Sequence, residues 1–416
     1  MSSVQTPKVA RRRVFYIPGY DPVPPRRYRE LYRKEGTAQA SISGYELALR
    51  PGAAGDRYGW HVVAEIEGAR VESDFSVLVW SDIVKQSMST SILRTYLAAA
   101  RIAWTYIGSG ALRALLTLRK GPSIVALYPV VMLLVQLVLA ALAGWAAGRL
   151  LLALGDRVPA LAGGPPLAVA LAWALGAVVA VLVLRWFRAR DGAFLTYYLM
   201  CNFAWSSSLR GENPPELEAR LAQFTERLRE ALDEEVDEIL VVGHSSGAHL
   251  GVSVLADLLR GGLPEGGAAL SFLTLGQVVP MASFLPRAWR LRADLQLMSE
   301  QDRIAWVDVT APGDGCAFAL CDPVAVSGVA REGKRWPLVF SAAFSRTLSP
   351  ARWRALRWRF FRLHFQYLCA FDRPGDYDYF RITAGPLTLG ARYGARAASK
   401  SRIERAASKF TSVEAA

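Results

Sequence analysis

The chain contains 416 residues, of which 52% are hydrophobic and 20% charged, and its mean hydropathy is +0.19. This composition is too apolar for an intrinsically disordered chain and high for a purely soluble enzyme, so the apolar excess must be concentrated in particular segments. The net charge of +13 favours contact with an anionic partner, either nucleic acid or an anionic membrane surface.

The first hundred residues are typical of a soluble domain that begins with strands. An apolar run at 14–17 predicts a first strand, followed by a loop over 18–25. No signal peptide is expected, because this run has four residues where a signal peptide needs about 7–15. Short apolar or alternating runs predict strands at 46–49, 60–67 and 75–80, and the periodicity of 92–118 predicts one long helix.

Two long apolar blocks follow. Residues 123–148 form a run of 26 without a charged side chain, and residues 158–184 form a second block. About 20 apolar residues are enough for a helix to cross a bilayer. Buried core helices are the alternative, but these seldom run past about 20 residues without one charge. The sequence therefore predicts a transmembrane hairpin with spans at about 123–148 and 165–187.

Basic residues flank the outer ends of this hairpin more heavily than its connection at 149–157. By the positive-inside rule, both termini and the soluble part are expected in the cytoplasm. The four cysteines form no C-x-x-C pair, which fits a reducing compartment and leaves no metal or other cofactor expected. The flanking basic residues are Arg113, Arg119 and Lys120 before the hairpin and Arg185, Arg188 and Arg190 after it.

Gly144 and Gly148 stand in G-x-x-x-G spacing within the first span. Such spacing permits close helix packing, and it makes a homodimer through the hairpin one prediction. Ordinary lipid-facing glycines are the equally good alternative.

The chain after the hairpin alternates helices and strands. A charged amphipathic stretch predicts a helix at 214–232, and a second helix is expected at 353–370. Strands apolar on both faces, alternating with helices, predict an α/β fold with a mostly parallel sheet covered by helices. Apolar runs predict these strands at 239–242, 272–275 and 304–309.

The predicted organisation is one α/β domain interrupted by the hairpin. Residues 12–120 and 191–390 form its two parts, residues 121–190 the hairpin, and residues 391–416 a basic tail.

The most informative motif is Gly243-His244-Ser245-Ser246-Gly247, a G-x-S-x-G pentapeptide. The bare pattern is weak evidence, but an apolar strand precedes it and a helical pattern follows it. A serine at such a strand–turn–helix junction adopts a strained backbone, and Gly243 and Gly247 allow strand and helix to approach closely.

With this motif the soluble part resembles the α/β-hydrolase superfamily of lipases, esterases and thioesterases. The resemblance implies that Ser245 is a nucleophile and that an acid and then a histidine follow it in the chain. Of the four histidines, only His364 lies far enough downstream, since His249 is four residues beyond the serine. A histidine packed among helix aromatics is the alternative reading of His364.

For the acid, the candidates are Asp314, in a turn after the strand 304–309, and Asp322, eight residues further on. The resemblance favours Asp314, although an ordinary turn aspartate would also fit Pro-Gly-Asp-Gly. It also implies an oxyanion hole made by the backbone N–H groups of Ser246 and of the loop at Gly19 and Tyr20.

The resulting expectation is a membrane-anchored serine hydrolase that cleaves an ester or thioester, with a lipid or acyl chain as one substrate class. The arginine-rich stretch 352–362 is expected to attract anionic lipid headgroups rather than nucleic acid. A P-loop-like run ends in Lys334-Arg335 without the Ser or Thr that binds Mg²⁺, so nucleotide binding is disfavoured.

The main alternative to the hydrolase is a catalytically inactive scaffold with the same fold. A transport component is disfavoured because the predicted spans carry no intramembrane charge.

Overall fold

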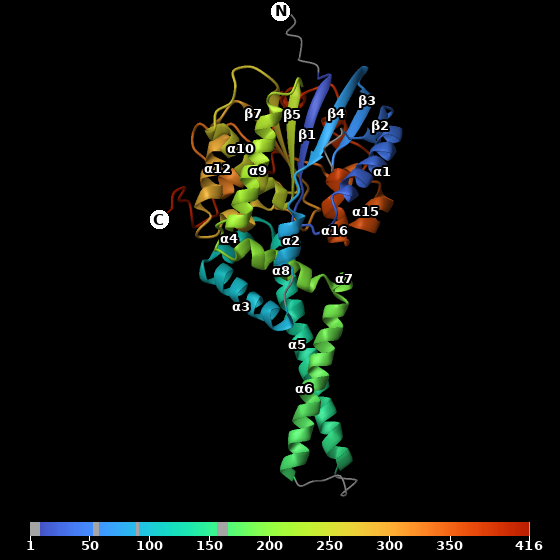
Figure 1. Cartoon of the computed structure of the whole chain (residues 1–416), viewed down its shortest axis with the longest axis vertical. Helices are drawn as coiled ribbons and strands as arrows, with labels where there is room; N and C mark the ends of the chain where they lie inside the picture. Colours follow the sequence, from blue (N-terminus) through green and yellow to red (C-terminus); the bar gives the residue numbers. More distant parts are fainter. Residues whose placement is uncertain (1–8, 53–57, 89–90, 156–164, 416) are drawn as a thin grey trace, which may run out of the picture. The chain divides into compact units, whose positions relative to one another are not determined.

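The computed structural model describes residues 9–52, 58–88, 91–155 and 165–415 (Figure 1). The chain divides into two compact units. The sheet unit comprises Met1–Gln86, Tyr106–Ser123 and Ser206–Ala416, and the hairpin unit comprises Ser87–Thr105 and Ile124–Trp205.

The sheet unit is built on one eight-stranded mixed sheet with the order β2-β3-β4-β1-β5-β6-β7-β8. The pairs β2–β3 and β3–β4 are antiparallel, and all other neighbours are parallel. The predicted α/β class is therefore confirmed. The strands are β1 (Arg11–Ile17), β2 (Glu46–Pro51), β3 (Trp60–Ile66), β4 (Ala69–Val77), β5 (Glu238–His244), β6 (Ala269–Leu275), β7 (Ile304–Thr310) and β8 (Leu338–Ser341).

Helices cover both faces of this sheet (Figure 1). One face packs against α9 (Pro215–Ala231), α10 (Ser246–Arg260) and α12 (Trp289–Glu300), and the other against α1 (Arg26–Ser43), α17 (Tyr379–Ala384) and α18 (Leu389–Tyr393). Alternate residues of β5 point to opposite faces of the sheet. Leu240 and Val242 point to the face covered by α1 and α17, where they belong to the same hydrophobic core as Tyr32 and Phe380. All seven residues of β5 are buried, as expected for a central strand covered on both sides.

The parallel strands end at one edge of the sheet, called here the carboxyl edge. β1 pairs with β4 on one side and β5 on the other, with Val14 opposite both Phe75 and Leu240. The loops after β1, β5, β6 and β7 therefore emerge side by side, and these loops carry the predicted site residues.

Most predicted strands are present, but β4 begins six residues before the prediction, and neither β8 nor α1 was predicted.

The prediction of one continuous helix was wrong for both 92–118 and 353–370, because each stretch is divided into shorter elements. The stretch 92–118 is two helices, α3 (Ile92–Gly108) and α4 (Ala111–Leu118), because Gly110 adopts a left-handed φ of 78° between them. The stretch 353–370 is three, α15 (Pro350–Leu356), α16 (Phe360–His364) and the 3₁₀ turn Phe365–Leu368.

The remaining helices of the sheet unit are short. They are α2 (Ser81–Ser87), α11 (Val279–Ser283), α13 (Pro323–Val326) and α14 (Phe344–Thr347). The basic tail is held to the unit by backbone hydrogen bonds: Ile403 N–H donates to the Leu320 carbonyl, and the Asp322 N–H donates to the carbonyl of Ile403.

Helix α5 (Lys120–Gly155), whose first four residues belong to the sheet unit, and α6 (Pro165–Ala189) are both long and apolar enough to cross a membrane. Only 22% of the most apolar window of α5 and 6% of that of α6 are buried, whereas a core helix of a soluble protein would be mostly buried. The connection at 156–164 lies outside the described residues. Two shorter helices follow α6, α7 (Asp191–Phe194) and α8 (Thr196–Ser207).

The G-x-x-x-G glycines lie where α5 meets α6. A Cβ on Gly144 would collide with the carbonyl oxygen of Gly176, and one on Gly148 would lie 2.9 Å from the carbonyl oxygen of Ala172. These glycines therefore allow α5 and α6 of the same chain to pack closely, and a homodimer through the hairpin stays a prediction.

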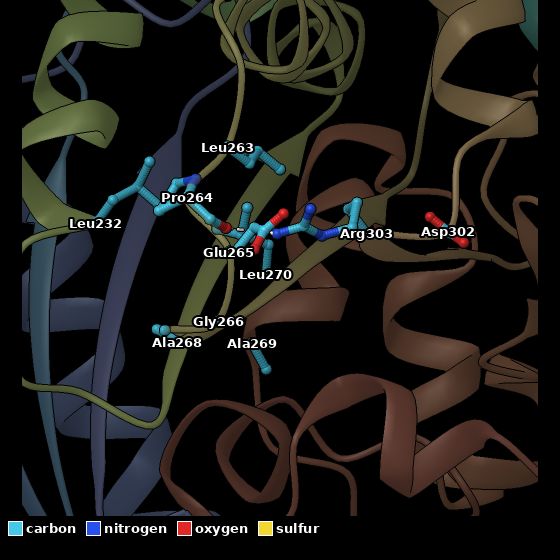
Figure 2. Close-up of a pocket in the computed structure, with 11 residues that line it drawn as sticks. Leu232, Leu263, Pro264, Glu265, Gly266, Ala268, Ala269, Leu270, Asp302 and Arg303 are labelled. Atoms are coloured by element: carbon cyan, nitrogen blue, oxygen red, sulfur yellow. Dashed lines mark hydrogen bonds between the residues drawn. The ribbon is translucent and has the colours of Figure 1, made fainter.

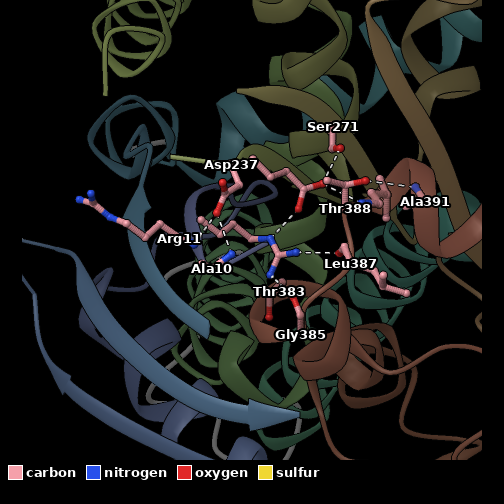
Figure 3. A network of polar contacts seen from close by, with 12 residues as sticks. Ala10, Arg11, Asp237, Ser271, Thr383, Gly385, Leu387, Thr388 and Ala391 are labelled. Carbon is pink, nitrogen blue, oxygen red and sulfur yellow. Dashed lines mark hydrogen bonds and ion pairs between the residues drawn. The ribbon is translucent and has the colours of Figure 1, made fainter. Parts of the chain in front are cut away.

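A buried ion pair joins the amino ends of the central strands (Figure 3). Arg12 Nε donates to Glu238 Oε2 at 2.6 Å, and neither side chain is exposed. The other arginine nitrogens donate to the carbonyls of Gly385 and Leu387, each at 2.8 Å. Glu238 Oε1 accepts from Ser271 Oγ, so β1, β5, β6 and the segment after α17 share one polar network.

Loss of one partner of this pair is expected to destabilise the fold strongly, because it leaves the other charge buried without compensation. We expect Arg12→Met or Glu238→Gln to lower the free energy of unfolding by about 3 kcal/mol or more. Denaturant unfolding of the detergent-solubilised chain measures this. The exposed pair of Arg33 and Glu30 is the control: Arg33→Met should leave the free energy of unfolding almost unchanged, because solvent screens an exposed pair. Equal effects at the two sites would contradict the prediction.

Candidate catalytic site

The turn between β5 and α10 places Ser245 at the carboxyl edge in a strained conformation. Its φ of 58° and ψ of −120° lie in a region that non-glycine residues rarely adopt. Its N–H donates to the carbonyl of Leu275 at 2.9 Å, which anchors the turn to the end of β6. A Cβ on Gly243 would lie 2.6 Å from the carbonyl oxygen of Gly247, and one on Gly247 would collide with that of Ile17.

The loop after β1 lies directly against Ser245. A Cβ on Gly19 would lie 2.9 Å from Ser245 Cβ and 3.3 Å from its Oγ. Trp80 Nε1 donates to the Pro18 carbonyl at 2.9 Å, and the rings of Tyr20 and Trp80 meet edge-on. The structure therefore brings both segments predicted to form an oxyanion hole, the Gly19–Tyr20 loop and Ser246 at the start of α10, beside the serine.

His364, the last residue of α16, is hydrogen-bonded to Asp314 in the loop after β7. The His364 Nδ1 to Asp314 Oδ2 distance is 2.7 Å, and both side chains are buried. Asp322, the other candidate, accepts from the backbone N–H groups of Val324 and Ala325 at the start of α13 and pairs with Lys334 at 2.7 Å. Of the two candidate acids, the one that contacts His364 is Asp314.

His364 also lies over Gly276, the residue that follows β6. A Cβ on Gly276 would lie 3.0 Å from His364 Cε1 and 2.7 Å from Tyr367 Cε2, and the φ of Gly276 is 56°. Because the preceding residue, Leu275, accepts the N–H of Ser245, serine and histidine are held at neighbouring loops of the carboxyl edge. His364 Nε2 is buried and has no hydrogen-bond partner among the described residues.

The Asp314 carboxylate accepts two further hydrogen bonds. Tyr367 donates its hydroxyl to Oδ2 at 3.0 Å, and the Cys316 N–H donates to Oδ1 at 2.9 Å. The Tyr367 oxygen accepts the Ala311 N–H at 2.9 Å in return. Burial, and then the charge of Asp314, raise the pKa of Tyr367 well above its ordinary value, so its hydroxyl stays a donor.

His244, inside the pentapeptide, also contacts His364. Its Nε2–H donates to the His364 carbonyl at 3.0 Å, and the two ring centroids are 4.9 Å apart. Burial first, and then the charge of His364, lower the pKa of His244 to about 3, so it is neutral at physiological pH. Neither this role nor that of Tyr367 could be predicted from the sequence, since both depend on contacts between distant segments.

The other two histidines lie elsewhere. His61 Nδ1 is 2.8 Å from Asp74 Oδ1, and the two residues are cross-strand neighbours in β3 and β4. His249 lies on α10, and its Nδ1 has no hydrogen-bond partner within the described part of the chain. Of the four, His364 is the histidine bonded to Asp314.

Among the described residues, Asp314, Cys316 and His364 form a group close enough to hold a metal ion, since their ligand atoms lie within 4.8 Å of one another. A metal-binding cysteine must be a thiolate. Burial, and then Asp314, raise the pKa of the Cys316 thiol well above its ordinary value, and Asp314 already accepts the Nδ1 proton of His364. The arrangement therefore fits a hydrogen-bonded pair better than a metal site.

A cavity of about 420 Å³ lies at the opposite edge of the sheet (Figure 2). Its walls include Ala269 and Leu270 at the start of β6 and Asp302 and Arg303 just before β7. Ser245 and Asp314 follow the other ends of their strands, so this cavity does not contain the candidate site.

Comparison with known proteins adds no relative: no family model, curated protein or solved structure matches the chain.

Asp308 is a second buried acid close to the site, on β7 itself. Its Oδ1 accepts from Thr274 Oγ1 at 2.6 Å, and its buried Oδ2 has no partner among the described residues. Burial first, and then the charge of Asp322, raise the pKa of Asp308 to about 8. The fold therefore holds this residue in its protonated form at neutral pH.

The contact between Tyr367 and Asp314 predicts a measurable effect on any reaction that uses the pair. We expect Tyr367→Phe to slow the reaction of Ser245 with a fluorophosphonate roughly tenfold, because one hydrogen bond to a charged acceptor is lost. Labelling rates of matched amounts of folded protein check this. Tyr377→Phe, at another buried tyrosine whose hydroxyl donates to the Tyr367 carbonyl, is the control for general loosening; equal losses in both variants would contradict a specific role.

Asp308 predicts a pH dependence of stability. An unfolded aspartate titrates near pH 4 and the folded one near 8, so between these values only the folded chain keeps the proton. The free energy of unfolding should therefore fall as pH rises, by at most about 1.4 kcal/mol per unit from this group. Asp308→Asn should flatten that slope between pH 5 and 8. The exposed Asp302→Asn should keep the wild-type slope; an unchanged slope in Asp308→Asn would show the prediction to be wrong.

Proposed function

We propose that the chain is a membrane-anchored serine hydrolase that cleaves an ester or thioester and resembles the α/β-hydrolase superfamily. The observation that carries this proposal is the buried hydrogen bond between His364 and Asp314 beside the strained turn of Ser245. The three residues follow the chain order serine, acid, histidine that the resemblance implies.

In the proposed reaction, Ser245 Oγ attacks the carbonyl carbon of the substrate while His364 Nε2 takes the serine proton. The Nδ1–H of His364 donates to Asp314, which holds the imidazole in the required tautomer and stabilises the imidazolium. The backbone N–H groups of Tyr20 and Ser246 stabilise the negative oxygen of the tetrahedral intermediate. His364 then returns the proton to the leaving alcohol or thiol, and water hydrolyses the acyl-enzyme by the same steps.

The neighbouring groups support this proton transfer electrostatically. His244 is neutral because its pKa is about 3, and Tyr367 is kept as a neutral donor, so neither adds a competing charge beside His364. The Asp314 carboxylate is then the charge that the imidazolium meets when it forms, at a hydrogen-bonding distance of 2.7 Å.

Membrane anchoring through α5 and α6 is the second part of the proposal. It is supported by helix length and by the exposure of their apolar side chains. Helix α3 also exposes Leu93, Leu97 and Trp104, which share one helical face, beside Arg94 and Arg101. This combination is typical of a helix that lies in the membrane interface. The basic flanks of the hairpin favour a cytoplasmic catalytic domain with both termini on the same side.

Fluorophosphonate labelling of the full chain in native membranes tests the catalytic proposal. Ser245→Ala should abolish labelling, and His364→Gln should slow it about a thousandfold or more, because the serine loses its base. The matched control is His61→Gln, which alters the other histidine that is bonded to an aspartate; it should label at the wild-type rate.

A folded wild-type chain that does not label would contradict the proposal and favour the catalytically inactive scaffold. Equal loss in His61→Gln and His364→Gln would show that the effect is not specific to the candidate site.

A further inference from the structure

The segment that carries His364 is strongly basic. Between Glu332 and Asp372 the sequence has no acidic residue, but it has eight lysines and arginines. We call residues 350–364, from the start of α15 to the end of α16, the docking segment. Its Arg352 is paired with Asp372 at 3.0 Å and with Glu35 at 3.7 Å.

The other four arginines of the docking segment are exposed and have no ion-pair partner within the described part of the chain: Arg354, Arg357, Arg359 and Arg362. Four uncompensated positive charges within nine residues produce a strong local positive potential. A partner for this surface has to be anionic.

Two aromatic side chains project from the same stretch. Trp358 is 71% exposed and Phe360 is 40% exposed, and their rings meet edge-on with centroids 6.5 Å apart. The Arg357 guanidinium lies 5.5 Å from the centroid of the Trp358 ring. An exposed tryptophan flanked by arginines is the composition that proteins place at the level of lipid headgroups, where the ring enters the interface and the charges meet phosphates.

The docking segment also covers the loop of the catalytic acid (α15 and α16 in Figure 1). Trp353 lies against Gly313, and a Cβ on Gly315 would be 3.0 Å from Phe360 Cδ1. His364 then bonds to Asp314 itself. Three side chains of one segment thus contact three consecutive residues of this loop, and the exposed Phe360 and the buried His364 are the two ends of the same five-residue helix.

The loop of the catalytic acid meets the beginning of α5 as well. A Cβ on Gly121 would lie 3.2 Å from Gly315 Cα, and Arg119 Nε donates to the Ala319 carbonyl at 2.7 Å. Only Pro122 and Ser123 separate Gly121 from Ile124, the first apolar residue of the first span, a rise of about 5 Å along a helix. Through Gly315, the docking segment is therefore connected to residues 119–123, the part of the sheet unit that leads directly into the first span.

We propose that residues 354–362 dock on the anionic lipid surface of the membrane that holds the hairpin, and that the substrate is an acyl ester of a lipid in that membrane. The arginines bind headgroup phosphates and Trp358 enters the interface. Since Phe360 and His364 share α16, docking fixes the position of the base against Asp314, and anionic lipid activates the enzyme. The identity of the substrate rests on the proposed hydrolase function; the docking surface does not.

Docking is measured directly, without catalysis. The full chain with Trp358→Cys is labelled with an environment-sensitive fluorophore and placed in nanodiscs of phosphatidylcholine, with or without one-third phosphatidylglycerol. We expect blue-shifted emission and quenching by spin-labelled lipid, both stronger with phosphatidylglycerol. Ser401→Cys, exposed in the tail, is the matched position and should show neither effect. The wild-type chain carried through the same labelling sets the background from native thiols.

Activation is measured as the ratio of turnover on a lipid ester in the nanodisc to turnover on a water-soluble short-chain ester. Phosphatidylglycerol should raise this ratio several-fold in the wild type. Arg357→Gln/Arg359→Gln should remove most of the increase. Lys400→Gln/Arg405→Gln, which removes the same charge from exposed sites of the tail, should retain it.

The outcomes separate the two proposals. Fluorophosphonate labelling of Ser245 without lipid quenching at residue 358 would overturn docking and leave the hydrolase proposal intact. Lipid quenching at residue 358 in a chain that does not label would support docking and remove the lipid substrate. Equal quenching with and without phosphatidylglycerol, or equal effects of the two double variants on the activity ratio, would overturn the role of anionic lipid.

Discussion

The structure depends on how closely backbone segments approach one another at the carboxyl edge of the sheet. At Gly19, Gly243, Gly247 and Gly276, an added Cβ would lie 3.0 Å or less from a neighbouring atom. These contacts bring the loops after β1, β5 and β6 together around Ser245 and force its backbone to a positive φ. The strain at one serine is thus maintained by the surrounding packing of glycines, which fixes where the side chains of the site can meet.

Buried polar groups around this edge are held in their uncharged forms. Burial lowers the pKa of His244 and raises those of Asp308 and Tyr367, so desolvation acts in the same sense on an imidazole, a carboxyl and a phenol. Three donors, from His364, Tyr367 and Cys316, converge on the Asp314 carboxylate. In the proposed reaction, the Asp314 carboxylate therefore stabilises the imidazolium of His364, and the neutral side chains of His244 and Tyr367 add no competing charge.

The local parts of this site could be predicted from the sequence, and the long-range parts could not. The strand, the serine and the helix of the turn are contiguous, so Gly243, Ser245 and Gly247 identify them directly. His364 followed from the chain order that the resemblance implies, because only one of the four histidines lies far enough beyond Ser245. Asp314 and Asp322 both follow β7, and only the structure shows that one contacts His364 while the other begins α13. Tyr367 was missed because its partner lies 53 residues away and no local pattern marks such a contact.

The wrong prediction of one helix over 353–370 has the most informative physical cause. The stretch has helical periodicity, but the helix ends at Leu356 and restarts at Phe360. A continuous helix would place Trp353, Phe360 and His364 at fixed helical positions, whereas the break lets each of them reach the loop 313–315. The break also leaves Trp358 exposed among arginines that make no ion pair within the described part of the chain. A solvent-facing tryptophan in this position gains little from the protein itself, and in the docking that we propose the lipid interface would supply the stabilisation that intramolecular packing does not.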